Sequence, residues 1–548
     1  MRRHTWLVAT LLFGSGFCAL VYQIGWLREF RLIFGASTAA SAAVLAICVG
    51  GLGAGGWLMG TRADAHPRPL LFYAQLEAIV ALSAAATPLL LWLVRALYVG
   101  VGGTGVLGPG AGTIGRLVLG ALVLALPPLA MGGTLPAAAR SVTVQGDAGR
   151  RDVAALYGLN TLGAVAGCLA ATFFMLEIFG TRATLWLTAA VNLIVALVAW
   201  QMDRTRSAGP LPPSREKRAT DEPDATHDSA PTWFVLVASG SVGFAFFLME
   251  LVWYRMLGPL LGGSVFTFGL ILAVALAGIG VGGLWYALAW RGRPATLTAF
   301  TWTCLLEAAA IALPFALGDR IALVALVLRP LARIGFSAQI VTWAIVSALV
   351  VLPASIVAGY QFPLLIALFG RGRDRLGRQV GAIYASNSAG AIAGSLAGGF
   401  GLLPWLSATG TWRVGALSLM ALGLGAMALS WRRGARLATF AQAAVALAIP
   451  ACLLATGPTA VWRHSGIGAG RARVAISSWN QMREWTQSLQ RAIVWDEDGT
   501  ESSVALVVES AGYGFIVNGK ADGSARTDAG TQVMLGLLGA ILKPDARR

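Results

Sequence analysis

Charged residues are scarce in this chain: Asp, Glu, Lys and Arg make up 12% of its 548 residues, against roughly 25% in an average soluble protein. This scarcity excludes a water-soluble protein with a single core. Lysine occurs only at Lys217, Lys520 and Lys543, so the formal charge of +16 comes from arginine. Because the arginines stand mostly at the ends of apolar runs, we attribute them to membrane orientation and expect no nucleic-acid partner.

Cysteine and histidine are also few, with five and four residues. The cysteines all lie inside apolar stretches and form no Cys-x-x-Cys motif, which excludes a disulfide framework and a zinc site. The histidines are scattered along the chain. We therefore expect no metal site and no catalytic group built on histidine.

Apolar residues and glycine dominate instead, with 57% hydrophobic residues and 68 glycines. Thirteen apolar runs approach the ~20 residues that a helix needs to cross a bilayer. The sequence therefore predicts a polytopic membrane protein. The predicted spans are 5–27, 36–60, 69–94, 114–137, 153–176, 183–201, 232–256, 264–290, 297–317, 338–368, 380–405, 412–431 and 437–456.

The first half of the chain repeats in the second half at a shift of 227 residues. So many matches at one shift indicate a duplicated six-helix unit. Several matched glycines have the Gly-x-x-x-Gly spacing that lets helix backbones touch. The matched pairs include Gly16/Gly243, Trp26/Trp253, Arg28/Arg255, Gly51/Gly278, Gly55/Gly282, Pro136/Pro363, Tyr157/Tyr384, Asn160/Asn387, Gly163/Gly390 and Gly167/Gly394.

Arginine is concentrated in the loops that follow even-numbered spans, which predicts that these loops and the N-terminus are cytoplasmic. Each half has an even number of spans, so the two repeats are expected to be parallel. Arg320, Arg329 and Arg333, near the ninth span, are exceptions to this distribution. The loop arginines include Arg62, Arg68, Arg140, Arg150, Arg151, Arg291, Arg293, Arg371, Arg373, Arg375, Arg378, Arg432, Arg433 and Arg436.

The fold class that follows is an all-α polytopic membrane bundle of two parallel six-helix repeats plus one extra span, with a small C-terminal β-rich α+β lobe. In the lobe, alternating residues predict strands at 491–496, 502–508 and 513–517, and a helix at 528–542. If 437–456 crosses the membrane, the lobe lies outside the cytoplasm. The predicted domains are 1–202 (first repeat), 203–231 (cytoplasmic linker), 232–434 (second repeat), 435–457 (thirteenth span) and 458–548 (lobe).

Glutamate lies deep inside two predicted spans, at Glu77 and Glu307, which match after a local slip of three residues. Each stands about nine residues into its span, roughly 13 Å at 1.5 Å per residue. An acid at this depth is costly and faces a partner or a water-filled cavity. Two interpretations stay open: a carboxyl group hydrogen-bonded to a neighbouring helix, or a cation or proton site that points toward the interface of the repeats.

Polar and aromatic residues recur at matching positions in other spans. Trp and Arg near the ends of the first span of each half are typical of an interfacial belt with snorkelling arginines, which leaves Glu250 unexplained. Tyr and Asn in the fifth span of each half share a helical face, as interhelical hydrogen-bonding groups or as ligand contacts. The candidate transport or cavity residues are Glu77, Glu307, Glu250, Gln23, Tyr157, Asn160, Tyr384 and Asn387.

Three motifs together carry a family resemblance. They are the glycine-rich second span that leads to Arg62 and Asp64, the Tyr-x-x-Asn-x-x-Gly span, and a tail with Phe-Ile-Val-Asn-Gly-Lys at 515–520, then Asp528, Thr531 and Gln532, and Pro-Asp-Ala-Arg-Arg at 544–548. The chain thus resembles bacterial membrane proteins in which a major-facilitator-like helical region is fused to a spermidine synthase (polyamine aminopropyltransferase) domain. The tail resembles only the small N-terminal lobe of the synthase.

The resemblance implies a protein of the bacterial cytoplasmic (inner) membrane, with Asp522, Asp528 and Gln532 as polyamine contacts. Decarboxylated S-adenosylmethionine would be the co-substrate of the complete family domain. Because that domain's donor-binding sheet and catalytic Asp would follow Arg548, we expect no catalytic residue and no cofactor in this chain, and no aminopropyl transfer by it alone. Two other functions stay open: a major-facilitator-like transporter of a small solute, for which positive charge is one option, and a membrane scaffold.

Overall fold

The computed structural model describes residues 3–34, 38–142, 150–207, 230–289, 295–370, 375–431, 436–472, 478–510 and 512–543. Most of the predicted linker and the sequence 544–548 lie outside the described residues. So do several loop arginines on which the predicted orientation depends: Arg291, Arg293, Arg371, Arg373, Arg432 and Arg433.

The first half consists almost entirely of helices. Long apolar runs form helices in a bilayer because a helix satisfies every backbone polar group within its own segment. The fourth span is built from α4 and α5, whose axes bend by 41° at a short break. The elements are α1 (Arg3–Phe34), α2 (Thr38–Ala65), α3 (Pro69–Gly100), α4 (Gly103–Leu124), α5 (Leu126–Val142), α6 (Arg151–Ala170), η1 (Ala171–Met175), α7 (Leu176–Ile178) and α8 (Gly180–Ser207).

The second half repeats this order. A π-helical turn closes the fifth span of each half, η1 in the first and η3 in the second, and these two turns are again 227 residues apart. The elements are α9 (Thr232–Leu261), α10 (Val265–Ala289), α11 (Leu297–Leu317), α12 (Asp319–Leu328), η2 (Arg329–Arg333), α13 (Phe336–Phe369), α14 (Leu376–Ala397), η3 (Gly398–Leu402) and α15 (Leu403–Trp431).

The helices of the two halves pack in the same pattern. In the first half α1 packs on α6 and α8, α2 on α5, and α3 on α8; in the second half α9 packs on α14 and α15, α10 on α13, and α11 on α15. The halves meet through two contacts, α2 with α14 and α6 with α10. Exchanging the two halves converts one contact into the other, because α2 matches α10 and α6 matches α14. This pattern agrees with the predicted parallel repeats.

Matched glycines make equivalent backbone contacts in each half. Gly163 lies against the carbonyl of Phe13, and Gly390 lies against the carbonyl of Gly240, 227 residues further on. A side chain at either position would separate the helices. The predicted role of the Gly-x-x-x-Gly rows in close helix packing therefore agrees with the structure.

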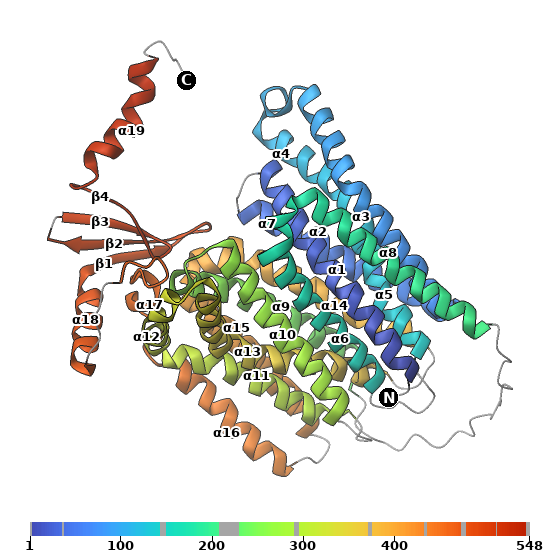
Figure 1. The fold of residues 1–548 in the computed structure, drawn as a ribbon. Helices are drawn as coiled ribbons and strands as arrows, with labels where there is room; N and C mark the ends of the chain where they lie inside the picture. Colours follow the sequence, from blue (N-terminus) through green and yellow to red (C-terminus); the bar gives the residue numbers. More distant parts are fainter. Residues whose placement is uncertain are drawn as a thin grey trace.

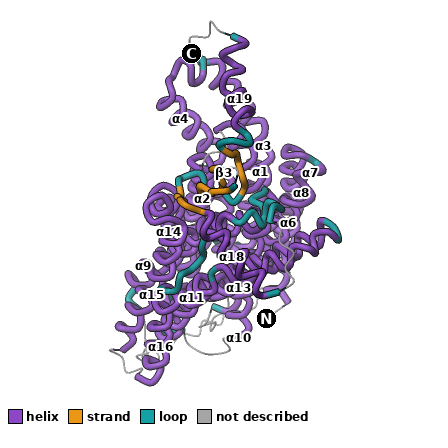
Figure 2. The backbone as a smooth tube through the Cα atoms, turned by 90° about the vertical axis from the view of Figure 1, so that its left-hand side faces the viewer, coloured by secondary structure: helices purple, strands orange, loops and turns teal. Residues whose placement is uncertain are grey.

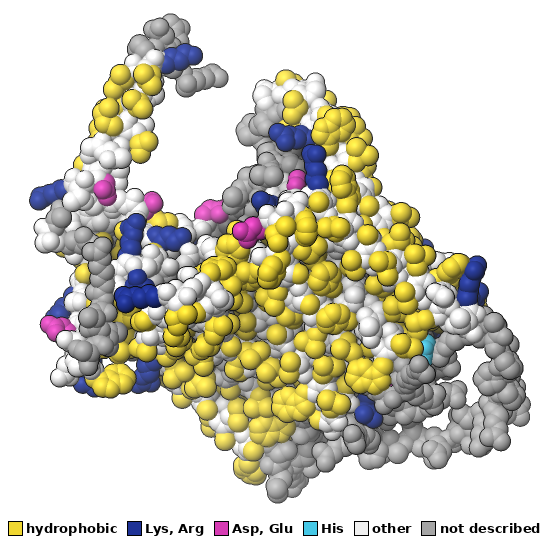
Figure 3. All heavy atoms as spheres, in the orientation of Figure 1, with side chains coloured by type: hydrophobic (Ala, Val, Ile, Leu, Met, Phe, Trp, Pro, Cys, Tyr) yellow, Lys and Arg dark blue, Asp and Glu magenta, His cyan; other side chains and the backbone are white. Residues whose placement is uncertain are grey.

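Nine helices among the described residues are long and apolar enough to cross a membrane, or ten if the bent pair α4 and α5 counts as one span. One of these helices, Leu376–Trp431, is 56 residues long and covers two predicted spans, since about 20 residues suffice for a crossing. The chain turns within it at Ser407, whose φ is 62°. Hydrophobic side chains cover most of the bundle face that Figure 3 shows, as a lipid-facing surface requires.

Helix α16 (Arg436–Leu453) follows the second half and packs on α11 and α15. Gln442, near its start, donates to the carbonyl of Thr298 at the start of α11. The carbonyl of Leu453, at its end, accepts from Arg413 near the start of α15. Helix α16 therefore runs parallel to α11 and antiparallel to α15, and it carries the chain back across the bundle.

The C-terminal lobe contains four antiparallel strands in the order β1-β2-β3-β4. The strands β1 to β3 and the last helix lie within two residues of the predicted positions, whereas α18 and β4 were not predicted. Asn518 and Gly519 both have positive φ and form the tight turn from β3 to β4. The elements are α17 (Ala460–His464), α18 (Trp479–Ala492), β1 (Ile493–Asp498), β2 (Ser503–Glu509), β3 (Gly512–Val517), β4 (Lys520–Ser524) and α19 (Ala529–Leu542).

The lobe sits at the end of the bundle opposite the N-terminus (Figure 1). Trp462 of α17 donates to the carbonyl of Met256 near the end of α9, and Thr459 bonds to Asp319 at the start of α12. In Figure 2, which is viewed from the side of the lobe, the strands form one small patch in front of the helices, and α19 extends away from it. The small β-rich lobe and the helical bundle together confirm the predicted fold class.

Candidate functional site

Glu77 lies inside the first half, not at the interface of the halves. Its side chain is 1% exposed, and Asn192 of α8 donates to its carboxyl group over 2.5 Å. Ser15 of α1 and Tyr73 of α3 also lie beside the carboxyl group. Glu77 therefore joins α1, α3 and α8 of one half, as the first of the two open interpretations predicted.

Glu307 is also 1% exposed, and it lies inside the second half. Its carboxyl group faces Gln361 of α13. The predicted orientation of both acids toward the interface is therefore wrong, because each is buried against helices of its own half.

Glu250 of α9 is the acid that faces the interface of the halves. It shares a helical face with Gly243, which packs on α14, and with Phe247, which reaches α2 of the first half. It also lies within electrostatic range of Cys168 in α6 of the first half. Its side chain is half-buried, and it makes no hydrogen bond or ion pair with any residue that the structure describes.

Gln23 of α1 occupies the position that matches Glu250. It is also half-buried and shares a face with Gly16, which packs on Asn160 of α6. One half thus presents a neutral amide at this level, and the other half a carboxyl group. Both residues lie roughly 27–30 Å along their helices from the N-terminal side, at 1.5 Å per residue.

Trp26 and Trp253 do not form an interfacial belt, so this prediction is wrong. Each is 1% exposed, and Trp26 donates to Thr87 over 3.1 Å. The large rings fill the inside of each half, where their burial stabilises the packing of the helices. The arginines that follow them diverge: Arg28 donates to the carbonyl of Leu176 in its own half, whereas Arg255 reaches the C-terminal lobe.

Tyr157 and Tyr384 meet in an aromatic layer across the interface. Phe362 of α13 lies between them, with its ring 4.6 Å from the ring of Tyr157 and 6.0 Å from that of Tyr384. Tyr157 is the seventh residue of α6, so this layer lies roughly 9 Å from the N-terminal end of that helix. The aromatic layer therefore lies between the halves on the N-terminal side of Glu250.

The asparagines at the other candidate positions hold helices together. Asn387 donates to the carbonyl of Ser239 in α9 over 3.0 Å, and the side chain of Asn160 lies against Gly16 of α1. Each contact joins the first and fifth spans of one half. This arrangement supports interhelical hydrogen bonding for the asparagines and leaves Tyr157 and Tyr384 as the residues at the interface.

Polar contacts that the sequence did not reveal join the halves at their N-terminal ends. Asp64 of α2 accepts from the backbone N–H groups of Gly377 and Arg378 over 2.8 and 2.9 Å. Arg150 donates to Gln379 over 2.5 Å, and Arg151 donates to the carbonyl of Ala287 over 2.9 Å. Asp64 lies at the end of α2 and Arg150 directly before α6, but the partners of both charged side chains follow only from the fold.

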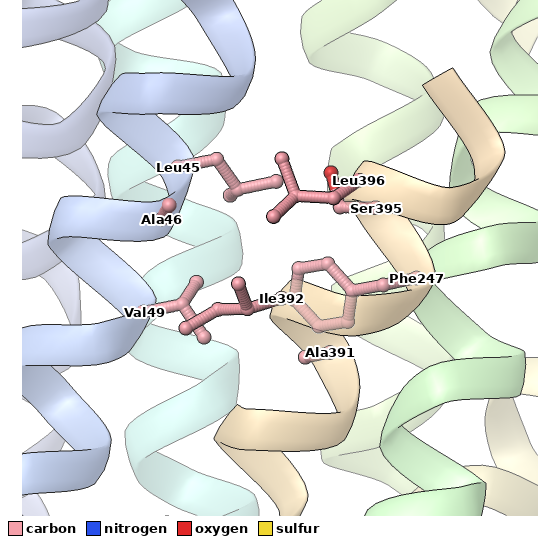
Figure 4. Close-up of a pocket in the computed structure, with 8 residues that line it drawn as sticks. All are labelled: Leu45, Ala46, Val49, Phe247, Ala391, Ile392, Ser395 and Leu396. Carbon is pink, nitrogen blue, oxygen red and sulfur yellow. The ribbon is translucent and has the colours of Figure 1, made fainter. Parts of the chain in front are cut away.

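The remaining contact between α2 and α14 is apolar, and Figure 4 shows its side chains facing one another, with Phe247 of α9 beside them. The space that they enclose is too small for a water molecule. The side chains are Leu45, Ala46, Val49, Phe247, Ala391, Ile392, Ser395 and Leu396.

Asp522, Asp528 and Gln532 are exposed on the lobe, and the side chain of Gln532 lies against Gly523. Asp528 accepts from the backbone N–H of Ser524 over 3.1 Å, and the backbone N–H of Gln532 donates to the carbonyl of Asp528. These bonds shape the connection from β4 to α19.

An ion-pair network fastens the lobe to the bundle. Arg463 bonds to Asp496 over 2.5 Å and to Asp498 over 2.8 Å, and Asp498 also accepts from the backbone N–H of Ala408 in α15 over 2.8 Å. The hydrogen bond from His464 and the charge of Arg463 lower the pKa of Asp496, and partial burial opposes them. The network had no sequence signal, because its members belong to three segments of the chain.

Comparisons with known proteins return similar folds only. No family model matches the chain, and no curated protein matches it. Among solved structures, it is similar to a bacterial homologue of the iron transporter ferroportin in the outward-facing state, with 14% identity, a TM-score of 0.49, and coverage of 78% of this chain and 100% of that chain. It is also similar to the proton:xylose symporter XylE bound to 6-bromo-6-deoxy-D-glucose, with 13% identity, a TM-score of 0.46, and coverage of 78% and 94%.

The predicted resemblance to membrane-bound spermidine-synthase-like proteins is therefore wrong. No family model and no curated protein connects the chain to that family, and the similar solved structures reported above are two transporters. The motifs that carried the resemblance have structural roles here: Asp64 joins the halves, and Asn518-Gly519 forms a hairpin turn. Without the resemblance, nothing supports polyamine transfer, its co-substrate or the polyamine contacts on the lobe.

Proposed function

We propose that this protein is a major-facilitator-like transporter that moves a small cationic solute between its two halves. The observation that carries the proposal is Glu250, a half-buried acid at the interface of two parallel repeats with no hydrogen bond or ion pair to a described residue. A charge at this depth is costly unless a partner compensates for it. A bound cation would supply that compensation.

Access to Glu250 from the N-terminal side is closed in two layers. The aromatic layer of Tyr157, Phe362 and Tyr384 lies nearer to Glu250, and the contacts of Asp64, Arg150 and Arg151 lie nearer to the membrane surface. Both layers join one half to the other, so a rocking motion of the halves would break them together. This geometry supports alternating access with a gate on the N-terminal side.

The arginine-rich loops support an N-terminus in the cytoplasm of a bacterial cell and a location in the inner membrane. With this orientation, the lobe lies outside the cytoplasm, because α16 ends on the side opposite the N-terminus. We retain the domains 1–202, 203–231, 232–434, 435–457 and 458–548 as part of the proposal. Reporter fusions after residue 207 and after residue 470 test the orientation: cytoplasmic activity is expected only for the first.

The transport test uses the purified chain in liposomes. Uptake of labelled choline, lysine and tetraethylammonium is compared with uptake of xylose and glutamate, and protein-free liposomes serve as the blank. We expect at least one cation to enter faster than in the blank and the anion to be excluded. Uptake of only the neutral or the anionic solute would contradict the assigned role of Glu250.

A further inference from the structure

Arg329 and Arg333 lie in η2, on the face of the bundle that carries the lobe. They are among the exceptions to the arginine distribution that predicts the orientation. Arg329 donates to the backbone carbonyls of Gly470 and Ala472, so it holds the segment that leads to the lobe. Arg333 is exposed and makes no hydrogen bond or ion pair within the part of the chain that the structure describes.

Both arginines line a cavity of about 700 Å³. Its walls come from the ends of α9 and α12, from η2, from the first turns of α13 and from the segment 467–472. Cavities of roughly 300–1,000 Å³ hold small molecules in proteins. This cavity is separate from the interface of the halves and from Glu250.

The cavity has an apolar floor and a cationic rim. Leu260, Leu326 and Val346 form part of the floor, whereas Arg333 and Gln339 stand at the rim. None of the residues that line it, all of which the structure describes, is acidic. The cavity therefore suits an anionic group attached to a hydrocarbon chain better than it suits a cation.

The surroundings of the cavity belong to the lipid-facing surface. Ile334 is 78% exposed, Phe336 51% and Val341 55%, and all three lie at the start of α13 or just before it. Trp343 lines the cavity itself, and tryptophan is enriched where acyl chains meet headgroups. A lipid of the adjacent leaflet could thus reach the cavity from the side.

We propose that this cavity binds an anionic phospholipid of the leaflet on the lobe side. The phosphate would accept from Arg333 and Gln339 in charge-assisted hydrogen bonds, and the first part of an acyl chain would cover Leu260, Leu326 and Val346. A free phosphate ion would pair with Arg333 but leave the apolar floor uncovered. The proposal does not depend on transport, and it assigns a role to an arginine that the orientation rule leaves unexplained.

The test is native mass spectrometry of the purified full chain with added dioleoyl phosphatidylglycerol or dioleoyl phosphatidylcholine. We expect tighter retention of phosphatidylglycerol, and a loss of affinity of about tenfold in Arg333→Gln, the scale of one charge-assisted bond. Arg320→Gln is the matched control, because Arg320 is an exposed arginine on α12 that does not line the cavity. This control should retain the lipid like the parent.

A second variant tests the cavity without removing a charge. Ala332→Trp narrows the rim and should also reduce retention, with an unchanged unfolding temperature. Equal retention of the two lipids, or equal effects of Arg333→Gln and Arg320→Gln, would overturn the proposal. If inorganic phosphate raises the unfolding temperature while no phosphatidylglycerol is retained, the bound anion is free phosphate and the proposal of a lipid is overturned.

Discussion

Gly163 gives the sharpest test of how the repeats pack. A Cβ atom built at this position would lie 1.9 Å from the carbonyl oxygen of Phe13, and one built at Gly390 would lie 1.8 Å from that of Gly240. Real Cβ atoms essentially never approach closer than 3.0 Å. Gly163→Ala must therefore push α6 away from α1 by roughly 1 Å in a closely packed interior.

The expected cost follows from two opposing effects. Overpacking of this kind destabilises by about 1–3 kcal/mol, whereas replacing glycine by alanine inside a helix gains about 0.5–1 kcal/mol. We therefore expect Gly163→Ala to lower the free energy of unfolding by up to about 2.5 kcal/mol, and by about 1.3 kcal/mol at the middle of both ranges. Gly390→Ala should lower it by a similar amount, because its contact is the repeat of the first.

Gly425→Ala is the matched control, since an added Cβ at this exposed position of α15 would meet no atom within 4 Å. This variant should gain stability from helix propensity alone. The measurement is reversible unfolding in mixed detergent micelles, followed by circular dichroism. Equal stability of Gly163→Ala and Gly425→Ala would refute the assigned backbone contact between α1 and α6.

Three further predictions concern the lobe and the gate. Arg463→Gln leaves the buried carboxylate of Asp498 without its ion pair, at a cost of about 3–5 kcal/mol, so hydrogen exchange in β1 should accelerate while exchange in the spans stays unchanged. The pKa of Asp496 is lower in the folded protein than in the unfolded chain, where it is about 3.9. Its ionised side chain therefore stabilises the fold above that pH, and this contribution is lost as the pH falls through the folded pKa. The unfolding temperature of Asp496→Asn should thus depend less on pH below about 4 than that of the parent. Asp64→Asn weakens two hydrogen bonds to a charged acceptor, each worth about 1.5–3 kcal/mol. In this variant, a cysteine that replaces Tyr384 should react at least tenfold faster with an impermeant maleimide added from the N-terminal side. An unchanged reaction rate would exclude Asp64 from the gate.

The repeat was predictable because glycines at helix contacts recur at matching positions in the sequence. A glycine at a helix contact cannot be replaced without moving the helices, so Gly163 and Gly390 carry the packing pattern in their spacing alone. The turn at Asn518-Gly519 was also open to prediction, since this dipeptide between two apolar runs favours a hairpin. The β4 strand is short and polar, so it lacks the alternating apolar residues that predict a strand.

The direction of a side chain around a helix was not predictable from depth alone. Glu77 and Glu307 were expected at the interface because both are deep in their spans, but depth is set by distance along the axis and direction by rotation around it. Glu250 needed the positions of α2 and α6 before its orientation could be assigned. Arg463 and Asp498 are 35 residues apart and bond to a third segment at Ala408, so only the fold brings them together.

The most direct test of the proposed function is the initial rate of cation uptake by Glu250→Gln in proteoliposomes. Glu77→Gln is the matched control, because it changes another acid inside the helical bundle that does not face the interface. We expect Glu250→Gln to lose at least tenfold in the rate of uptake, about 1.4 kcal/mol, with an unchanged unfolding temperature, while Glu77→Gln keeps the parental rate whenever it folds. Parental uptake by a folded Glu250→Gln variant would contradict the proposal that this carboxyl group contacts the solute.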